Sequence, residues 1–150
     1  MKILSYIEKK IIIDAPIKTI YELWTTRAGV NRFFAADSRI ELEPNGAYEI
    51  YFDVTQPYGA RGSEGCKVIR FIENEYLEFT WNVPPSFKKE REQNYQSIVK
   101  IEMTSINHNK TNITLRNEYH KQTEQLDEIS KYFDRAWDYV LNNLVEYLKK

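Results

Sequence analysis

The sequence predicts an α+β fold in which an antiparallel sheet is covered by one long C-terminal helix. Between residues 39 and 119, apolar and polar side chains mostly alternate, which is the period of half-buried strands. From Leu126 to Leu148, apolar side chains instead recur every three or four positions, the period of an amphipathic helix. Consecutive strands joined by short turns favour an antiparallel sheet, and the long helix then has to cover its apolar face.

The beginning of the chain is expected to form one strand and two short helices. In a strand over residues 6–14, Ile7, Ile11 and Ile13 share one face. Pro16 suits the first turn of the helix that follows, because its missing N–H costs nothing there. A second short helix is expected over residues 29–35. The first helix is indicated by four apolar residues at helical spacing, namely Ile17, Ile20, Tyr21 and Trp24.

About six strands are expected after the two short helices, and five segments are identified as strands. They read GAYEIYFDV, EGCKVIRFI, YLEFTW, YQSIVKIEM and TNITLRNEY, and the first follows the turn signal PNG at residues 44–46. A polar loop that contains the run KKERE (residues 88–92) separates the third from the fourth. The side chains expected to face inward are Tyr48, Ile50, Phe52, Val54, Leu77, Phe79, Trp81, Val99, Ile101, Met103, Ile113, Leu115, Asn117 and Tyr119.

The long helix is expected to begin at Thr123, which is a suitable N-cap residue. Acidic residues in its first turn and two terminal lysines match the helix dipole. Tyr132, Tyr139 and Tyr147 lie at the margins of the apolar stripe and are not expected to belong to a site. The stripe itself comprises Leu126, Ile129, Phe133, Trp137, Val140, Leu144 and Leu148.

The composition points to one soluble globular domain over residues 1–150. The formal charge is -1, so the basic stripe typical of nucleic-acid or anionic-membrane binders is not expected. The N-terminus lacks the pattern of a signal peptide, and no run approaches the roughly 20 apolar residues of a membrane span. Cys66 is the single cysteine and has no internal disulfide partner. A cytoplasmic location is therefore expected.

Three segments, in this order and spacing, resemble the family of activator-of-heat-shock-protein-ATPase homologues. They are IIIDAPIKTIYELWT, GCKVIRFIENEYLEFTW and WDYVLNNLVEYLKK. That family lies within the START-related, birch-pollen-allergen-like helix-grip superfamily, often called SRPBCC. The resemblance covers nearly the whole chain. It implies a curved antiparallel sheet of about six to seven strands wrapped around the C-terminal helix, with a cavity between them.

Two motifs depart from the pattern of that family. Many relatives have a Gly-Gly pair before the second long strand, where this chain has Asn45-Gly46. Many also carry a His-x-Gly motif near the end of the last strand, where this chain has Asn117 and Tyr119. Ligand chemistry that uses the family's histidine therefore does not transfer to this chain.

Few residues suggest catalysis or metal binding. His108 and His120 are expected at the surface, and no spacing of His, Cys, Asp and Glu suggests a metal site. Cys66 is interpreted as a small buried apolar residue. The glycines of GARGSEG (residues 59–65) fit a hairpin loop better than a phosphate loop. KKERE is interpreted as a solvated loop near the cavity mouth, with a lid as the alternative.

Polar side chains expected to face inward are the more informative ones. Ser97 and Asn117 share strand faces with apolar residues, and alternation places Glu64 and Arg70 beside Cys66 and Val68, unless a bulge reverses that face. Burying an unpaired amide or charge costs several kcal/mol, so such residues either pair with one another or line a wet cavity. Both interpretations of Asn117 remain open at this point.

The leading functional hypothesis is non-catalytic binding of a hydrophobic or aromatic small molecule, such as a lipid or a polyketide-like compound, between sheet and helix. No cofactor is expected, and the protein is expected as a monomer or a homodimer. One alternative is a co-chaperone-like protein with a chaperone partner. Another is a cyclase or dehydratase that uses Glu64, Arg70 or Tyr119. The candidate ligand-binding residues are Trp24, Phe34, Tyr48, Phe52, Arg70, Phe79, Trp81, Ser97, Asn117, Phe133 and Trp137.

Overall fold

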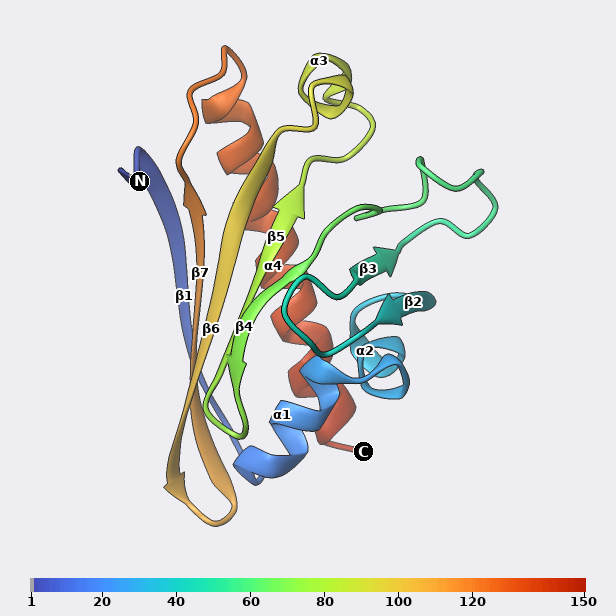
Figure 1. Cartoon of the computed structure of the whole chain (residues 1–150). Coiled ribbons are helices and arrows are strands. Elements are labelled where there is room, and N and C mark those ends of the chain that lie inside the picture. The colour runs from blue at the N-terminus through green and yellow to red at the C-terminus, as the bar shows by residue number, and fades with distance from the viewer. Residues whose placement is uncertain (1) are drawn as a thin grey trace.

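The computed structural model describes residues 2–150 and has the α+β architecture that the sequence predicts. A curved sheet lies across the long C-terminal helix, and two short helices pack at one end (Figure 1). In chain order the elements are β1 (Ser5–Ile13), α1 (Ile17–Thr25), α2 (Arg27–Phe33), β2 (Asp37–Ile40), β3 (Tyr48–Tyr51), β4 (Val68–Ile72), β5 (Tyr76–Asn82), α3 (Lys88–Glu92), β6 (Gln96–Asn107), β7 (Lys110–Tyr119) and α4 (Leu126–Leu148).

The main sheet has five antiparallel strands in the order β1-β7-β6-β5-β4. Strands β2 and β3 form a second, two-stranded sheet. Backbone hydrogen bonds outside the regular strand pairs join the two sheets. Tyr48 N donates to Cys66 O at 2.9 Å, and Val68 N donates to Gly46 O at 2.8 Å. The second sheet therefore extends the curve of the first beyond β4, which confirms the predicted helix-grip architecture.

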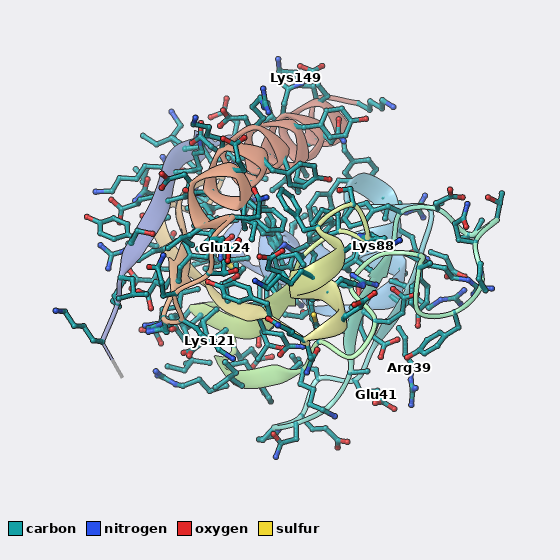
Figure 2. The ribbon with its side chains drawn as sticks, turned by 90° about the horizontal axis from the view of Figure 1, so that it is seen from above. Arg39, Glu41, Lys88, Lys121, Glu124 and Lys149 are labelled. Carbon is teal, nitrogen blue, oxygen red and sulfur yellow. The ribbon has the colours of Figure 1, made fainter. Side chains whose placement is uncertain are left out.

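The core lies between the inner face of the main sheet and α4. Figure 2 shows side chains filling the space between them. Ile129, Phe133, Trp137, Val140, Leu141 and Leu144 are the buried residues of α4. They pack in one cluster with Leu77, Phe79, Val99, Ile101, Ile113 and Leu115 from three strands. Burying each large apolar side chain contributes roughly 1.5–3 kcal/mol, so this stripe holds the helix on the sheet.

An ion pair adds to this packing at the edge strand β1. Lys9 lies on the inner face, between Ile7 and Ile11, and its ammonium group meets Asp134 at 2.7 Å and Asp138 at 3.0 Å on α4. The polar interruption of the β1 stripe therefore serves to tie the sheet edge to the helix. Within residues 2–150, none of the helices has the length and apolarity needed to cross a membrane.

Three local predictions were wrong. The strand predicted over GAYEIYFDV ends at Tyr51, because Phe52 N and Asp53 N turn to bond Arg61 O at 2.8 and 3.0 Å. Thr123 is not the N-cap of α4; its hydroxyl donates to the Glu90 carboxylate, and the helix begins three residues later. The run KKERE is not a solvated loop but the short helix α3, with Glu90 buried.

Arg70 does not face inward as strict alternation predicts. A bulge between Val68 and Arg70 inserts one residue, so Val68 opposes Phe79 on the inner face whereas Arg70 opposes Glu78 on the outer face. The Arg70 side chain is 59% exposed, lies 3.9 Å from the Glu78 carboxylate and stacks 4.6 Å above the Tyr76 ring. This position removes Arg70 from the interior.

Candidate functional site

A pocket of about 810 Å³ opens where α4, the end of β5 and the loop after β3 meet. We call it the aromatic pocket. Its lining comes from four parts of the chain that are far apart in sequence. The lining residues are Phe34, Phe52, Asp53, Gln56, Ala60, Arg61, Gly62, Ser63, Trp81, Asn82, Pro84, Pro85, Tyr132, Phe133, Arg135, Ala136, Trp137, Tyr139 and Val140.

The inner wall of the aromatic pocket is built around Phe34. This ring, at the end of α2, lies 5.7 Å from the Trp81 ring and 5.8 Å from the Trp137 ring, centroid to centroid. The two indoles lie 5.3 Å apart. Within residues 2–150, the indole N–H of Trp81 has no hydrogen-bond partner. Rings in such tilted and edge-on contact attract one another, so the three side chains form one continuous apolar wall.

The rim of the aromatic pocket carries exposed rings and two arginines. On α4, Tyr132, Arg135 and Tyr139 are spaced three and four residues apart, so they lie along one side of the helix. Tyr139 is 69% exposed and Tyr132 is 41% exposed. Phe52 and Arg61 line the pocket from the loop between β3 and β4, and Phe52 is 51% exposed.

That loop is held by a buried carboxylate. Glu64 accepts hydrogen bonds from the backbone N–H groups of Gly59, Arg61 and Gly62, at 2.5, 2.8 and 2.7 Å. Burial alone would raise the pKa of Glu64, but these backbone hydrogen bonds outweigh it and lower the pKa below its usual value. The carboxylate is therefore ionised at neutral pH and serves as the anchor of the loop.

Arg91, on α3, completes this anchor from the other side. Its guanidinium group donates to Gly62 O at 2.7 Å, to Gly59 O at 2.6 Å and to Val83 O at 2.6 Å, and it lies 3.1 Å from Glu64. The arginine thus ties the loop to the end of β5, next to Trp81 and Pro84. Arg91 and Glu64 position the pocket wall, although neither of them lines the pocket.

Asp53 and Cys66, the acid and the thiol near the pocket, are engaged in structural bonds. Asp53 accepts hydrogen bonds from the hydroxyl and the N–H of Thr55, which lower its pKa and keep it a carboxylate. Cys66 is fully buried beneath the loop, and burial raises the pKa of its thiol to about 12. The glycine-rich segment 59–65 is a loop, as expected, but it also forms part of the pocket wall.

The structure brings five of the eleven candidate ligand-binding residues to the aromatic pocket. These are Phe34, Phe52, Trp81, Phe133 and Trp137. Five others do not line the pocket and are buried in the core: Trp24, Tyr48, Phe79, Ser97 and Asn117. Tyr48, for example, stacks on Phe79 with the ring centroids 4.0 Å apart and donates its hydroxyl to Trp24 O. Arg70 lies on the outer face of the sheet.

Asn117 is part of a hydrogen-bond network in the core. Its amide nitrogen donates to Ser97 Oγ at 2.8 Å and to Ile98 O at 3.3 Å. Its amide oxygen accepts from Trp137 Nε1 at 3.1 Å and from the Tyr119 hydroxyl at 3.3 Å. Every polar atom of this side chain therefore has a protein partner, which favours the structural interpretation. The network fixes Trp137, which lines the pocket, to the sheet.

Sequence reasoning missed the rim of the pocket. It placed Tyr132 and Tyr139 at the margins of the apolar stripe and outside any site, whereas in the structure both line the pocket. It also gave no role to Arg61 or Arg135. The one available signal was the i, i+3, i+7 spacing of Tyr132, Arg135 and Tyr139 beside the apolar stripe. Nothing in the sequence indicated that residues 52–62 fold toward α4.

Comparisons with solved structures agree with this fold. Protein MLL2253 from Mesorhizobium loti is 14% identical with a TM-score of 0.74, and the match covers 97% of each chain. Protein NE0264 from Nitrosomonas europaea is 17% identical with a TM-score of 0.73, covering 96% of this chain and 94% of that one. The Aha1 dimer from Colwellia psychrerythraea is 17% identical with a TM-score of 0.67, covering 95% of each chain.

A search of curated proteins found no match. A family model, in contrast, matches residues 14–149, from the end of β1 through α4. This match includes all the residues of the aromatic pocket and the long helix on which the fold is built. The chain belongs to the family described as Activator of Hsp90 ATPase homolog 1-like protein.

Proposed function

We propose that this protein binds an apolar or aromatic small molecule in the aromatic pocket without transforming it. The observation that carries the proposal is the pocket itself, about 810 Å³ in volume with Phe34, Trp81 and Trp137 as its inner wall. Small-molecule sites typically enclose about 300–1,000 Å³ and combine apolar walls with a few polar groups. The ligand body would lie against these rings.

The polar chemistry of the pocket favours binding over catalysis. General acid–base catalysis requires a group that is poised to exchange a proton near neutral pH. Asp53 has a lowered pKa, and the carboxylate of Glu64 is directed at backbone N–H groups instead of at the pocket. Tyr119, considered above as a catalytic residue, is buried outside the pocket, and burial raises its pKa further. The arrangement supports a binding protein.

The proposal is tested by thermal shift and native mass spectrometry against a panel of fatty acids, flavonoids, polyketides and lipids. We expect at least one class to raise the melting temperature and to appear as a 1:1 adduct. A ligand present at about 100 times its Kd stabilises the folded state by about 2.7 kcal/mol, which is readily measured. Failure of every class to bind would contradict the proposal.

Replacing Phe52 or Tyr139 with alanine is expected to weaken binding of any ligand found by about 3- to 10-fold, since each ring supplies contact area at the rim. Both side chains are more than half exposed, so the free energy of unfolding should change by less than about 0.5 kcal/mol. The matched control is Ile12→Ala, because Ile12 is 62% exposed and does not line the pocket. Equal affinities for all three variants would exclude the rim from the site. Isothermal titration calorimetry provides the measurement.

A second candidate function is a chaperone interaction, which the description of the family favours. It would use the protein surface instead of the pocket, and a similar solved structure is a dimer. The test is whether the purified protein changes the ATPase rate of an Hsp90 chaperone. A changed rate that survives Phe52→Ala and Tyr139→Ala would support this function independently of the pocket.

A further inference from the structure

The charges at the rim of the aromatic pocket do not balance. Its lining residues include two arginines, Arg61 and Arg135, and one aspartate, Asp53, so 2 − 1 leaves a formal charge of +1. This contrasts with the formal charge of -1 of the whole chain. Asp53 is turned toward Thr55 and accepts hydrogen bonds from its hydroxyl and its backbone N–H. Neither arginine is neutralised by it.

The acidic neighbours of Arg135 are already paired. Asp134 and Asp138 lie beside it on α4, and both form ion pairs with the ammonium group of Lys9, at 2.7 and 3.0 Å. Among residues 2–150, the guanidinium group of Arg135 makes no hydrogen bond or ion pair. Arg135 lies on the same side of α4 as Tyr132 and Tyr139, so an unpaired cation lies at the pocket rim.

Arg61 is held in place but keeps donors free. Its Nε donates to Gln56 O at 2.7 Å, and its backbone N–H donates to Glu64 at 2.8 Å. Within the described part of the chain, its two terminal nitrogens have no acceptor. Asp37 is near enough for Arg61 to contribute to its lowered pKa, but that carboxylate is paired with Arg27 at 2.7 Å.

We propose that the ligand carries an anionic group, a carboxylate, sulfonate or phosphate on a flat apolar body, and that Arg135 and Arg61 bind this group at the rim. This inference rests on the proposed function of the pocket. The rings of the inner wall hold the apolar body, and the rim holds the charge where water still reaches it, so the anion is not fully desolvated. Arginine suits this task because its planar fork donates two parallel hydrogen bonds to such anions.

The test uses two dyes that share one skeleton. The first, 8-anilinonaphthalene-1-sulfonate, is anionic, and the second, N-phenyl-1-naphthylamine, lacks the sulfonate. Both become fluorescent in apolar surroundings, so a titration gives the Kd of each for the folded protein. Arg135→Gln is the decisive variant, because Arg135 holds no other part of the fold. Arg61→Gln and the double variant follow, with far-UV circular dichroism to verify folding.

We expect Arg135→Gln to raise the Kd of the sulfonated dye about 5-fold and the double variant to raise it about 20-fold. This is the size of effect expected from charge-assisted hydrogen bonds at a partly exposed site. The Kd of the uncharged dye should change less than about twofold. Arg70→Gln is the matched control: it also removes one positive charge, but from the outer face of the sheet, and should change neither Kd. High salt should reduce the preference for the anion.

An anionic-dye Kd in the double variant within about twofold of the wild-type value would overturn the inference, as would equal weakening of both dyes. In either case binding of the uncharged dye would leave the proposed function intact. If neither dye bound the wild-type protein, the inference would fail, and the ligand panel described above would still decide the proposed function.

Discussion

Trp137→Ala is expected to lower the free energy of unfolding by about 3–5 kcal/mol, the usual cost of removing a large buried ring. The residue is 1% exposed, packs against both Trp81 and Phe34, and donates its indole N–H to the Asn117 side chain. Its removal would leave a cavity and also an unpaired acceptor in the core. Urea unfolding followed by far-UV circular dichroism measures the change.

Trp137→Phe separates these two contributions. It keeps most of the ring but removes the N–H donor, so we expect a loss of about 1–2 kcal/mol. In an Asn117→Ala background the same substitution should cost less, because the acceptor is then absent and the two changes are coupled. Equal costs in both backgrounds would show that the hydrogen bond between Trp137 and Asn117 contributes nothing to stability.

The sequence predicts the elements of this fold well because periodicity is a local property. The Ile7, Ile11 and Ile13 stripe, the two short helices and the long apolar stripe of α4 are found where they were expected. The errors occur where tertiary contacts override the local pattern. Thr123 bonds the side chain of Glu90, a residue 33 positions away, instead of capping α4. The bulge before Arg70 reverses one face of β4, which alternation alone does not reveal.

The candidate site was predictable only on its inner side. Phe34, Trp81 and Trp137 are large rings on apolar stripes, so a search for inward-facing aromatic residues finds them, but it also finds Tyr48 and Phe79, which only pack. The outer side depends on a loop whose position is set by non-local bonds. Glu64 and Arg91 are 27 residues apart in the chain, and no periodic pattern connects them.

Glu64→Gln is expected to destabilise the protein by about 2–4 kcal/mol at pH 7, because it breaks a buried ion pair and removes the charge that three backbone N–H groups solvate. It should also weaken ligand binding, since the loop that carries Phe52 and Arg61 loses its anchor. Arg91→Met tests the same anchor from the other side and should have a similar effect. The matched control is Glu124→Gln, because the Glu124 side chain is 84% exposed and its pair with Lys89 contributes less than about 1 kcal/mol.

The dependence of this effect on pH has a definite sign. The pKa of Glu64 is lower in the folded protein than in the unfolded chain, where it is about 4.3, so the carboxylate stabilises the fold fully at pH values above that unfolded pKa. As the pH falls through 4.3 toward the lower folded pKa, this contribution is lost. The difference in unfolding free energy between the wild-type protein and Glu64→Gln should therefore shrink as the pH falls below about 4.3. Urea titrations on both sides of this pH measure the difference, and a constant gap would show that the charge of Glu64 does not anchor the pocket wall.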